Sequence, residues 1–179
     1  MTSSGIDRPA TLRLPEPCLI VLVGAAGSGK STLAARLFPP DSIFSSDANR
    51  ALVAGDPTDQ GATRTAFSIL HRQVERRLAA GRSCVVDATN VEVHARRALT
   101  RRAASHGILA VAIVLDLPPR LVLARNAARE GRIVPEAVVR RQLESLARSR
   151  RAGLEADGFA AIHVVRSAAQ LDALIVEYG

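Results

Sequence analysis

Eight residues near the N-terminus have the types and the spacing needed to hold a nucleoside triphosphate. Residues 24–31 read Gly-Ala-Ala-Gly-Ser-Gly-Lys-Ser, which fits the phosphate-binding pattern G-x-x-x-x-G-K-[ST] of a P-loop. The glycines allow backbone conformations that a Cβ atom would block, so successive N–H groups can turn toward phosphate oxygens. The predicted contacts to the nucleotide are Gly24, Ala25, Ala26, Gly27, Ser28, Gly29, Lys30, Ser31 and Thr32.

Two of these residues would do more than bind. Lys30 would reach the β- and γ-phosphates, and the Ser31 hydroxyl would be a ligand of Mg²⁺. Lys30 is the only lysine of the chain, in which every other basic side chain outside histidine is arginine. A compact ammonium and a planar guanidinium are not interchangeable between two phosphates, so this lysine has a specific reason to be there. The alternative is a decayed P-loop that only fills space.

An aspartate and an arginine follow the next predicted strand, 43–46. Asp47 precedes a predicted helix over 48–53, and Arg50 lies three residues on, so the two share one helical face. Asp47 could accept the proton of an acceptor hydroxyl, and Arg50 could hold an anionic part of the acceptor. The alternative for Asp47 is that it only caps the helix.

A second aspartate ends the predicted third strand, 83–87. Asp87 closes an apolar run and is followed by Ala-Thr-Asn, which makes it a candidate partner of Mg²⁺ in a P-loop protein. The alternative is an ordinary strand end. Asn90, in the same motif, and Arg97, on a helix predicted over 93–106, are candidate substrate contacts.

An arginine-bearing segment follows the fourth strand, 109–115. Arg125 and Arg129 share a helical face of a helix predicted from 118 to about 130, and Arg132 lies in the loop before a helix predicted from 136 to about 156. A lid over about 118–138 would bring these side chains onto the transferring phosphoryl group, as arginine fingers do. The alternative is a solvated amphipathic helix.

The elements that must position these residues alternate between strand and helix. Five strands, the last at 160–165, predict an α/β fold with a doubly wound parallel sheet and helices on both faces. Ligands collect at the carboxyl ends of such strands. We expect one domain over 18–179, a flexible lead-in over 1–17, and a last helix over 170–178 capped by Ser167. Arg166 would lie near the adenine ring of the nucleotide bound at the P-loop.

The composition limits the classes of partner and the cellular environment that the protein is expected to have. The 179 residues carry a formal net charge of +7 and a pI of about 11.0, which favours an acidic partner such as nucleic acid, although arginine-rich composition alone would give the same charge. No apolar run reaches the ~18 residues of a membrane span. Cys18 and Cys84 lie in apolar runs, as expected of reduced thiols in a cytoplasmic protein.

Together these motifs resemble the kinase domain of the polynucleotide 5′-hydroxyl kinases of nucleic-acid repair. The resemblance rests on the P-loop, on Ser45-Ser46-Asp47-x-x-Arg50, on 86–90 (Val-Asp-Ala-Thr-Asn) and on the lid ending at 132–135 (Arg-Ile-Val-Pro). It implies an adenylate-kinase-like fold and Mg²⁺-dependent transfer of the ATP γ-phosphate to a DNA or RNA 5′-OH end. It also implies that Asp47 is the general base, that Arg50 contacts the acceptor's phosphate, and that Arg125 or Arg129 engages the donor phosphates.

Two other functions fit the same residues. The protein could phosphorylate the hydroxyl of a small molecule, with Arg50 on a carboxylate or phosphate of that acceptor. It could instead be a nucleotide-binding switch without transfer, which would leave Asp47 and Arg50 unexplained. The small number of aromatic residues, one Tyr and four Phe, leaves little for base stacking in an acceptor groove.

Overall fold

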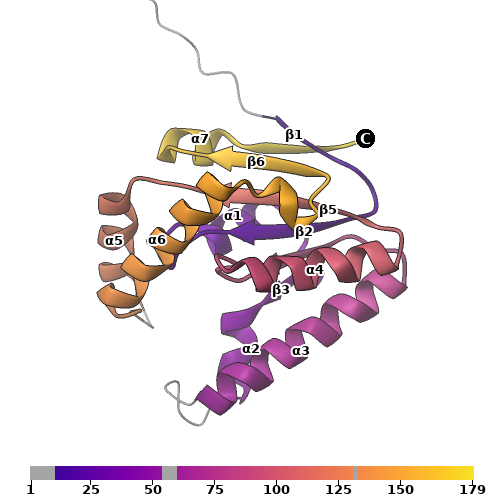
Figure 1. Ribbon diagram of the computed structural model, residues 1–179, viewed down its shortest axis with the longest axis horizontal. Coiled ribbons are helices and arrows are strands. Elements are labelled where there is room, and N and C mark those ends of the chain that lie inside the picture. The colour runs from indigo at the N-terminus through magenta and orange to yellow at the C-terminus, as the bar shows by residue number, and fades with distance from the viewer. Residues whose placement is uncertain (1–10, 54–59, 131–132) are drawn as a thin grey trace, which may run out of the picture.

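The computed structural model describes residues 11–53, 60–130 and 133–179, and a parallel five-stranded sheet is at its centre (Figure 1). The strand order β3-β4-β2-β5-β6, with every neighbouring pair parallel, confirms the predicted doubly wound α/β fold. The strands are β1 (Thr11–Leu14), β2 (Cys18–Val23), β3 (Ile43–Ser45), β4 (Cys84–Asp87), β5 (Leu109–Leu115), β6 (Ala161–Val165) and β7 (Ile175–Tyr178).

Helices fill the connections between these strands. Those described are α1 (Lys30–Leu37), α2 (Ser46–Val53), α3 (Gln60–Ala79), α4 (Val93–Ser105), α5 (Pro119–Ala127), α6 (Glu136–Ala152) and α7 (Ala168–Ala173), with single 3-10 turns at Pro40–Ser42 and Glu155–Asp157. None of the described helices is both long and apolar enough to cross a bilayer.

The central strand β2 divides the hydrophobic core into two layers. Its side chains alternate between the two faces of the sheet, as strand geometry requires. One set packs with side chains of α1, α5 and α7, and the other packs with side chains of α3 and α4. Because both faces are covered, the strand is apolar throughout, and all six residues are buried. The loops at its carboxyl end are therefore built on a rigid support.

The two ends of the described chain form a small second sheet, which corrects two predictions. The predicted lead-in over 1–17 contains β1, which pairs in parallel with β7 in the register Thr11↔Ile175. The helix predicted over 170–178 ends at Ala173 and gives way to β7. The reason is that residues 174–178 are rich in β-branched and aromatic side chains, which suit a strand once a partner strand is available.

The lid helices lie beside the carboxyl ends of β2 and β5, where Figure 1 shows α5 and the first turns of α6 together. Helix α5 ends at Ala127, earlier than predicted, and α6 ends at Ala152 because Gly153 adopts a positive φ of 86°. The lid and the P-loop therefore share one edge of the molecule, as expected from the sequence.

Both cysteine thiols are buried at the starts of neighbouring strands. Burial raises the pKa of Cys18 to about 11 and that of Cys84 to about 12, against 9.0 for an exposed thiol.

We expect iodoacetamide to modify neither thiol in the native protein and both in denaturing urea. The thiols ionise at a lower pH in the unfolded chain than in the folded protein. The free energy of unfolding should therefore fall as the pH rises above about 9. Rapid labelling of the native protein would contradict this.

Candidate active site

A cavity of about 490 Å³ opens where the P-loop, α2 and the lid helices meet. Its lining contains most of the residues proposed from the sequence together with several others. The residues are Ala26, Gly27, Gly29, Lys30, Ser31, Thr32, Ser46, Asp47, Arg50, Phe67, Asp87, Ala88, Thr89, Arg125, Arg129, Val134, Val138, Gln142, Leu171 and Asp172.

The P-loop packs tightly against α5. Gly27 has a φ of +85°, and a Cβ atom on it would lie 2.5 Å from the Val122 carbonyl oxygen and 2.9 Å from the Asn126 Cβ. No L-residue with a side chain fits there without displacing backbone, so the glycine is required by conformation and by space. The loop is thus seated on the base of the lid.

The ammonium of Lys30 is held by the loop's own backbone. Its Nζ donates to the Gly24 and Ala25 carbonyl oxygens, at 2.9 Å in both cases. Burial lowers the pKa of Lys30 to about 8, against the opposing influence of the Asp87 and Asp47 carboxylates. An anion beside this group would favour the charged form, which is the setting expected of a phosphate-binding lysine.

Ser31 and Asp87 meet directly. The Ser31 hydroxyl donates to Asp87 Oδ2 at 2.7 Å, which joins the start of α1 to the end of β4. A hydroxyl and a carboxylate are hard oxygen ligands of the kind Mg²⁺ prefers, and Mg²⁺ usually completes its shell with waters and substrate phosphates. The pair fits the predicted metal site. No cluster of three or more His, Cys, Asp or Glu suited to a metal occurs among the described residues.

Asp47 faces the P-loop across the cavity between two arginines. Its Oδ1 accepts from Arg50 Nη1 at 2.7 Å, and its Oδ2 lies 3.7 Å from Arg129 Nη2. Helix α2 begins at Ser46, one residue before Asp47, and the Ser45 hydroxyl accepts the Ala48 N–H at 3.4 Å. The capping alternative for Asp47 is therefore wrong, since its place is in the first turn and Ser45 caps the helix.

Arg50 is largely enclosed in the cavity wall. Its side chain is 13% exposed, compared with 51% for Asp47. Its Nε is buried and has no hydrogen-bond partner in the part of the chain that the structure describes. An unpaired buried donor costs about 1–3 kcal/mol, so an anionic group that accepted this N–H would be bound favourably.

At the base of the lid, the Asn126 side chain connects helix α5 to the segment before α6. Asn126 Nδ2 donates to the Val134 carbonyl oxygen at 2.8 Å, and Asn126 Oδ1 accepts the Val134 N–H at 3.3 Å. Arg125 extends from this base toward the P-loop, with Nη1 3.7 Å from the position of a Cβ on Gly29. Arg125 and Arg129 both line the cavity, whereas Arg132 lies outside the described residues.

Besides Gly24, Ala25 and Ser28 of the P-loop, three predicted binding residues of the described chain do not line this cavity. Arg97 Nε donates to Asp157 Oδ1 at 3.1 Å, on the outer side of α4. Asn90, in a left-handed conformation with φ 47°, is buried and donates to the carbonyl oxygens of Leu22 and Ala88. The Arg166 backbone donates to the Gln170 side chain. The Asn90 and Arg97 side chains make hydrogen bonds within the protein, whereas Asp87 and Thr89 of the same motif as Asn90 line the cavity.

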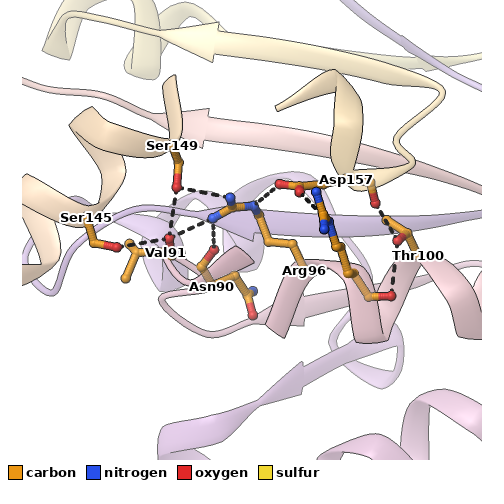
Figure 2. Close-up of polar contacts among 8 residues, drawn as sticks. Asn90, Val91, Arg96, Thr100, Ser145, Ser149 and Asp157 are labelled. Atoms are coloured by element: carbon orange, nitrogen blue, oxygen red, sulfur yellow. Dashed lines mark hydrogen bonds and ion pairs between the residues drawn. The ribbon is translucent and has the colours of Figure 1, made fainter. Parts of the chain in front are cut away.

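The segment that follows Asp87 is held by a buried arginine, shown in Figure 2. Arg96, 1% exposed, donates from Nη1 to the carbonyl oxygens of Asn90 and Val91 at 3.0 and 2.7 Å. Its Nε donates to Asp157 Oδ2 at 2.7 Å, and its Nη2 donates to the Ser149 hydroxyl at 3.0 Å. This network joins α4, α6 and the segment after β4.

Several residues of the cavity have no motif to reveal them. Gln142, Phe67 and Asp172 come from helices whose sequences show only ordinary amphipathic patterns. Thr89 also lines the cavity, and it belongs to the motif over 86–90, which by itself indicates no role for this residue. Helical periodicity could have identified the solvent-facing or core-facing side of each helix, but not which turn meets the P-loop.

The chain is similar to a known protein family. Residues 19–151 match the model of a protein family described as an AAA domain. The chain belongs to that family. The match covers the P-loop, the Asp47 region and the lid. No curated protein is significantly similar to the chain.

Solved structures share the fold at low sequence identity. A sugar kinase from Janibacter sp. HTCC2649 is 23% identical, with a TM-score of 0.57 and coverage of 84% of this chain and 85% of that one. A gluconokinase from Sinorhizobium meliloti 1021 is 22% identical, with a TM-score of 0.55 and coverage of 89% and 87%. A chain of the Pnkp1/Rnl/Hen1 complex is 23% identical, with a TM-score of 0.55 and coverage of 70% and 44%.

The two arginines on Asp157 allow a matched test of the support behind Asp87. We expect Arg96→Met to lower the free energy of unfolding by about 3–5 kcal/mol, because it removes one partner of a buried ion pair. Arg97→Met should cost less than about 1 kcal/mol, because the Arg97 side chain is 48% exposed. Urea unfolding followed by circular dichroism measures both. Equal losses in the two variants would contradict the assignment of Arg96 as the support.

Proposed function

We propose that this domain is an ATP-dependent kinase that phosphorylates a hydroxyl lying next to an anionic group, and that the preferred acceptor is the 5′-OH end of a polynucleotide. The observation that carries the proposal is the pair Asp47 and Arg50 in the wall facing the P-loop. A carboxylate there can take a proton, and the unpaired Arg50 Nε supports an acceptor that brings its own negative charge.

The donor side follows from the P-loop. The triphosphate would lie along the backbone N–H groups of Gly27 and of residues 29–32, with Lys30 exchanging its carbonyl partners for phosphate oxygens. Arg125 and Arg129 would approach from the lid and offset the charge of the transferring group. Ser31 and Asp87 would hold Mg²⁺, whose positive charge would offset part of the charge of the donor phosphates.

Transfer would be an in-line exchange of one P–O bond for another. The acceptor hydroxyl oxygen forms a bond to the γ-phosphorus while the bond from that phosphorus to the bridging oxygen of ADP breaks. The hydroxyl proton passes to a carboxylate oxygen of Asp47. Arg50 holds the anionic group of the acceptor beside Asp47, so that one helical turn of α2 both positions and deprotonates the acceptor.

A polynucleotide acceptor is supported by the net charge of +7 and by the resemblance of the motifs around Asp47 and Asp87. A small-molecule acceptor is the second candidate. It is favoured by the cavity of about 490 Å³, whose described lining has Phe67 as its one aromatic residue, and by the sugar kinase and gluconokinase folds. The two acceptors predict different dependence on salt.

Asparagine has nearly the same shape as aspartate but cannot act as a general base. We expect Asp47→Asn to lower the rate of phosphoryl transfer by about 10²–10⁴, the usual contribution of a general base, and to leave ATP affinity within a few-fold of the wild type. Asp41→Asn, an exposed aspartate outside the cavity lining, is the control and should keep full activity. Full activity of the Asp47 variant would show that the base is elsewhere.

Radiolabel transfer from γ-labelled ATP across 5′-OH DNA and RNA oligonucleotides and small alcohols identifies the acceptor. For a polynucleotide held by about three phosphate contacts, raising the salt from about 50 to about 200 mM should weaken acceptor affinity by roughly tenfold or more. Labelling of a small alcohol with little salt dependence, and without competition from oligonucleotides, would favour the second candidate. An absence of label on every 5′-OH end, with ATP bound, would rule out the polynucleotide acceptor.

A further inference from the structure

Helix α6 contributes a glutamine that touches the P-loop. Gln142 Oε1 accepts the backbone N–H of Ala26 at 2.9 Å, across a separation of 116 residues in the chain. Gln142 is half-buried and lines the same cavity as Lys30, Arg125 and Arg129. Neither the motifs of the sequence nor the proposed mechanism gives this residue a role.

The contact falls on a particular peptide unit of the loop. The Ala25 carbonyl and the Ala26 N–H belong to one peptide group, and Lys30 Nζ donates to that carbonyl at 2.9 Å. Lys30 and Gln142 therefore hold opposite edges of the same peptide. Because the P-loop lysine serves the β- and γ-phosphates, this peptide borders the place where the end of the triphosphate would lie.

The chemistry of the amide decides which way its donors point. A backbone N–H can only donate, so the side-chain atom facing Ala26 must be the oxygen, and the two N–H donors of Nε2 lie on the other branch. No hydrogen bond of that nitrogen occurs within the described part of the chain, and it is not among the buried atoms that lack a partner there. The donors are thus available at the cavity wall.

Helix α6 is held in the position that this role needs. The hydroxyls of Ser145 and Ser149 donate to the Val91 carbonyl oxygen, at 3.3 Å in both cases. Ser145 lies three residues after Gln142 and Ser149 seven residues after it, so all three fall near one face of the helix. The contact of Gln142 with the P-loop is therefore set by packing before any ligand is bound.

We propose that Gln142 is a donor-binding residue that recognises the γ-phosphate: its Oε1 orients the Ala25–Ala26 peptide and its Nε2 donates to a γ-phosphate oxygen. The inference rests on the proposed ATP-dependent function and deepens it. It makes α6, whose first turn belongs to the lid, the element that distinguishes a triphosphate from a diphosphate.

Calorimetric titration with the non-hydrolysable triphosphate AMP-PNP and with ADP, both with Mg²⁺, tests this on the full chain. Gln142→Leu should weaken AMP-PNP binding at least tenfold, as expected for the loss of a hydrogen bond to a charged group, and change ADP binding by no more than about twofold. Gln142→Glu keeps the oxygen for Ala26 but loses the donors and adds a negative charge. It should lose more affinity for AMP-PNP than Gln142→Leu does.

Glu144→Leu, at an exposed position on the same helix, is the control and should bind both nucleotides as the wild type does. Equal weakening of AMP-PNP and ADP by Gln142→Leu would mean that the residue only shapes the loop, and it would overturn the proposal. So would wild-type affinity of Gln142→Glu for AMP-PNP. If the wild type binds AMP-PNP but phosphorylates no acceptor, the proposed transfer function fails while the role of Gln142 is still decided by these titrations.

Discussion

One backbone hydrogen bond joins the two loops on which the site depends. The Gly24 N–H donates to the Thr89 carbonyl oxygen at 2.9 Å, which connects the first residue of the P-loop to the segment after β4. Because β2 and β4 are neighbours in the sheet, this bond brings Asp87 to the Ser31 hydroxyl. A shift of either loop would separate the pair that fits a metal ion.

A buried polar network around Arg96 holds the segment after β4 in place. Arg96 is fully buried, and its guanidinium donates hydrogen bonds to two carbonyl oxygens, a hydroxyl and the Asp157 carboxylate. A charge in that position is tolerated because it is paired and hydrogen-bonded, and its cost is offset only while the network is complete. The network does not enter the cavity, but it holds the segment that carries Asp87 and Thr89 in one conformation.

The acceptor side is built differently from the donor side. The P-loop is packed against α5, α6 and the end of β4, whereas Asp47 and Arg50 stand on α2, an eight-residue helix that packs chiefly against α3. Figure 1 shows α2 and the start of α3 extending away from the sheet. The contact between Arg129 and Asp47 links this projecting wall to the lid across the cavity. The wall that carries Asp47 and Arg50 is therefore held by fewer elements than the P-loop is.

The sequence by itself determined the sheet, its connections and the P-loop, because continuous apolar runs and a spaced glycine motif are local signals. It also predicted that Ser31, Asp47, Arg50 and Asp87 lie around one cavity, since strand ends in a parallel sheet converge on one edge. The tertiary structure alone decided which helical turns face that edge. It turned Arg97 onto Asp157, buried Asn90 against Leu22, paired β7 with β1, and brought Gln142 to Ala26. Those contacts join residues about 60 to 165 positions apart, a separation over which periodicity and local propensity carry no information.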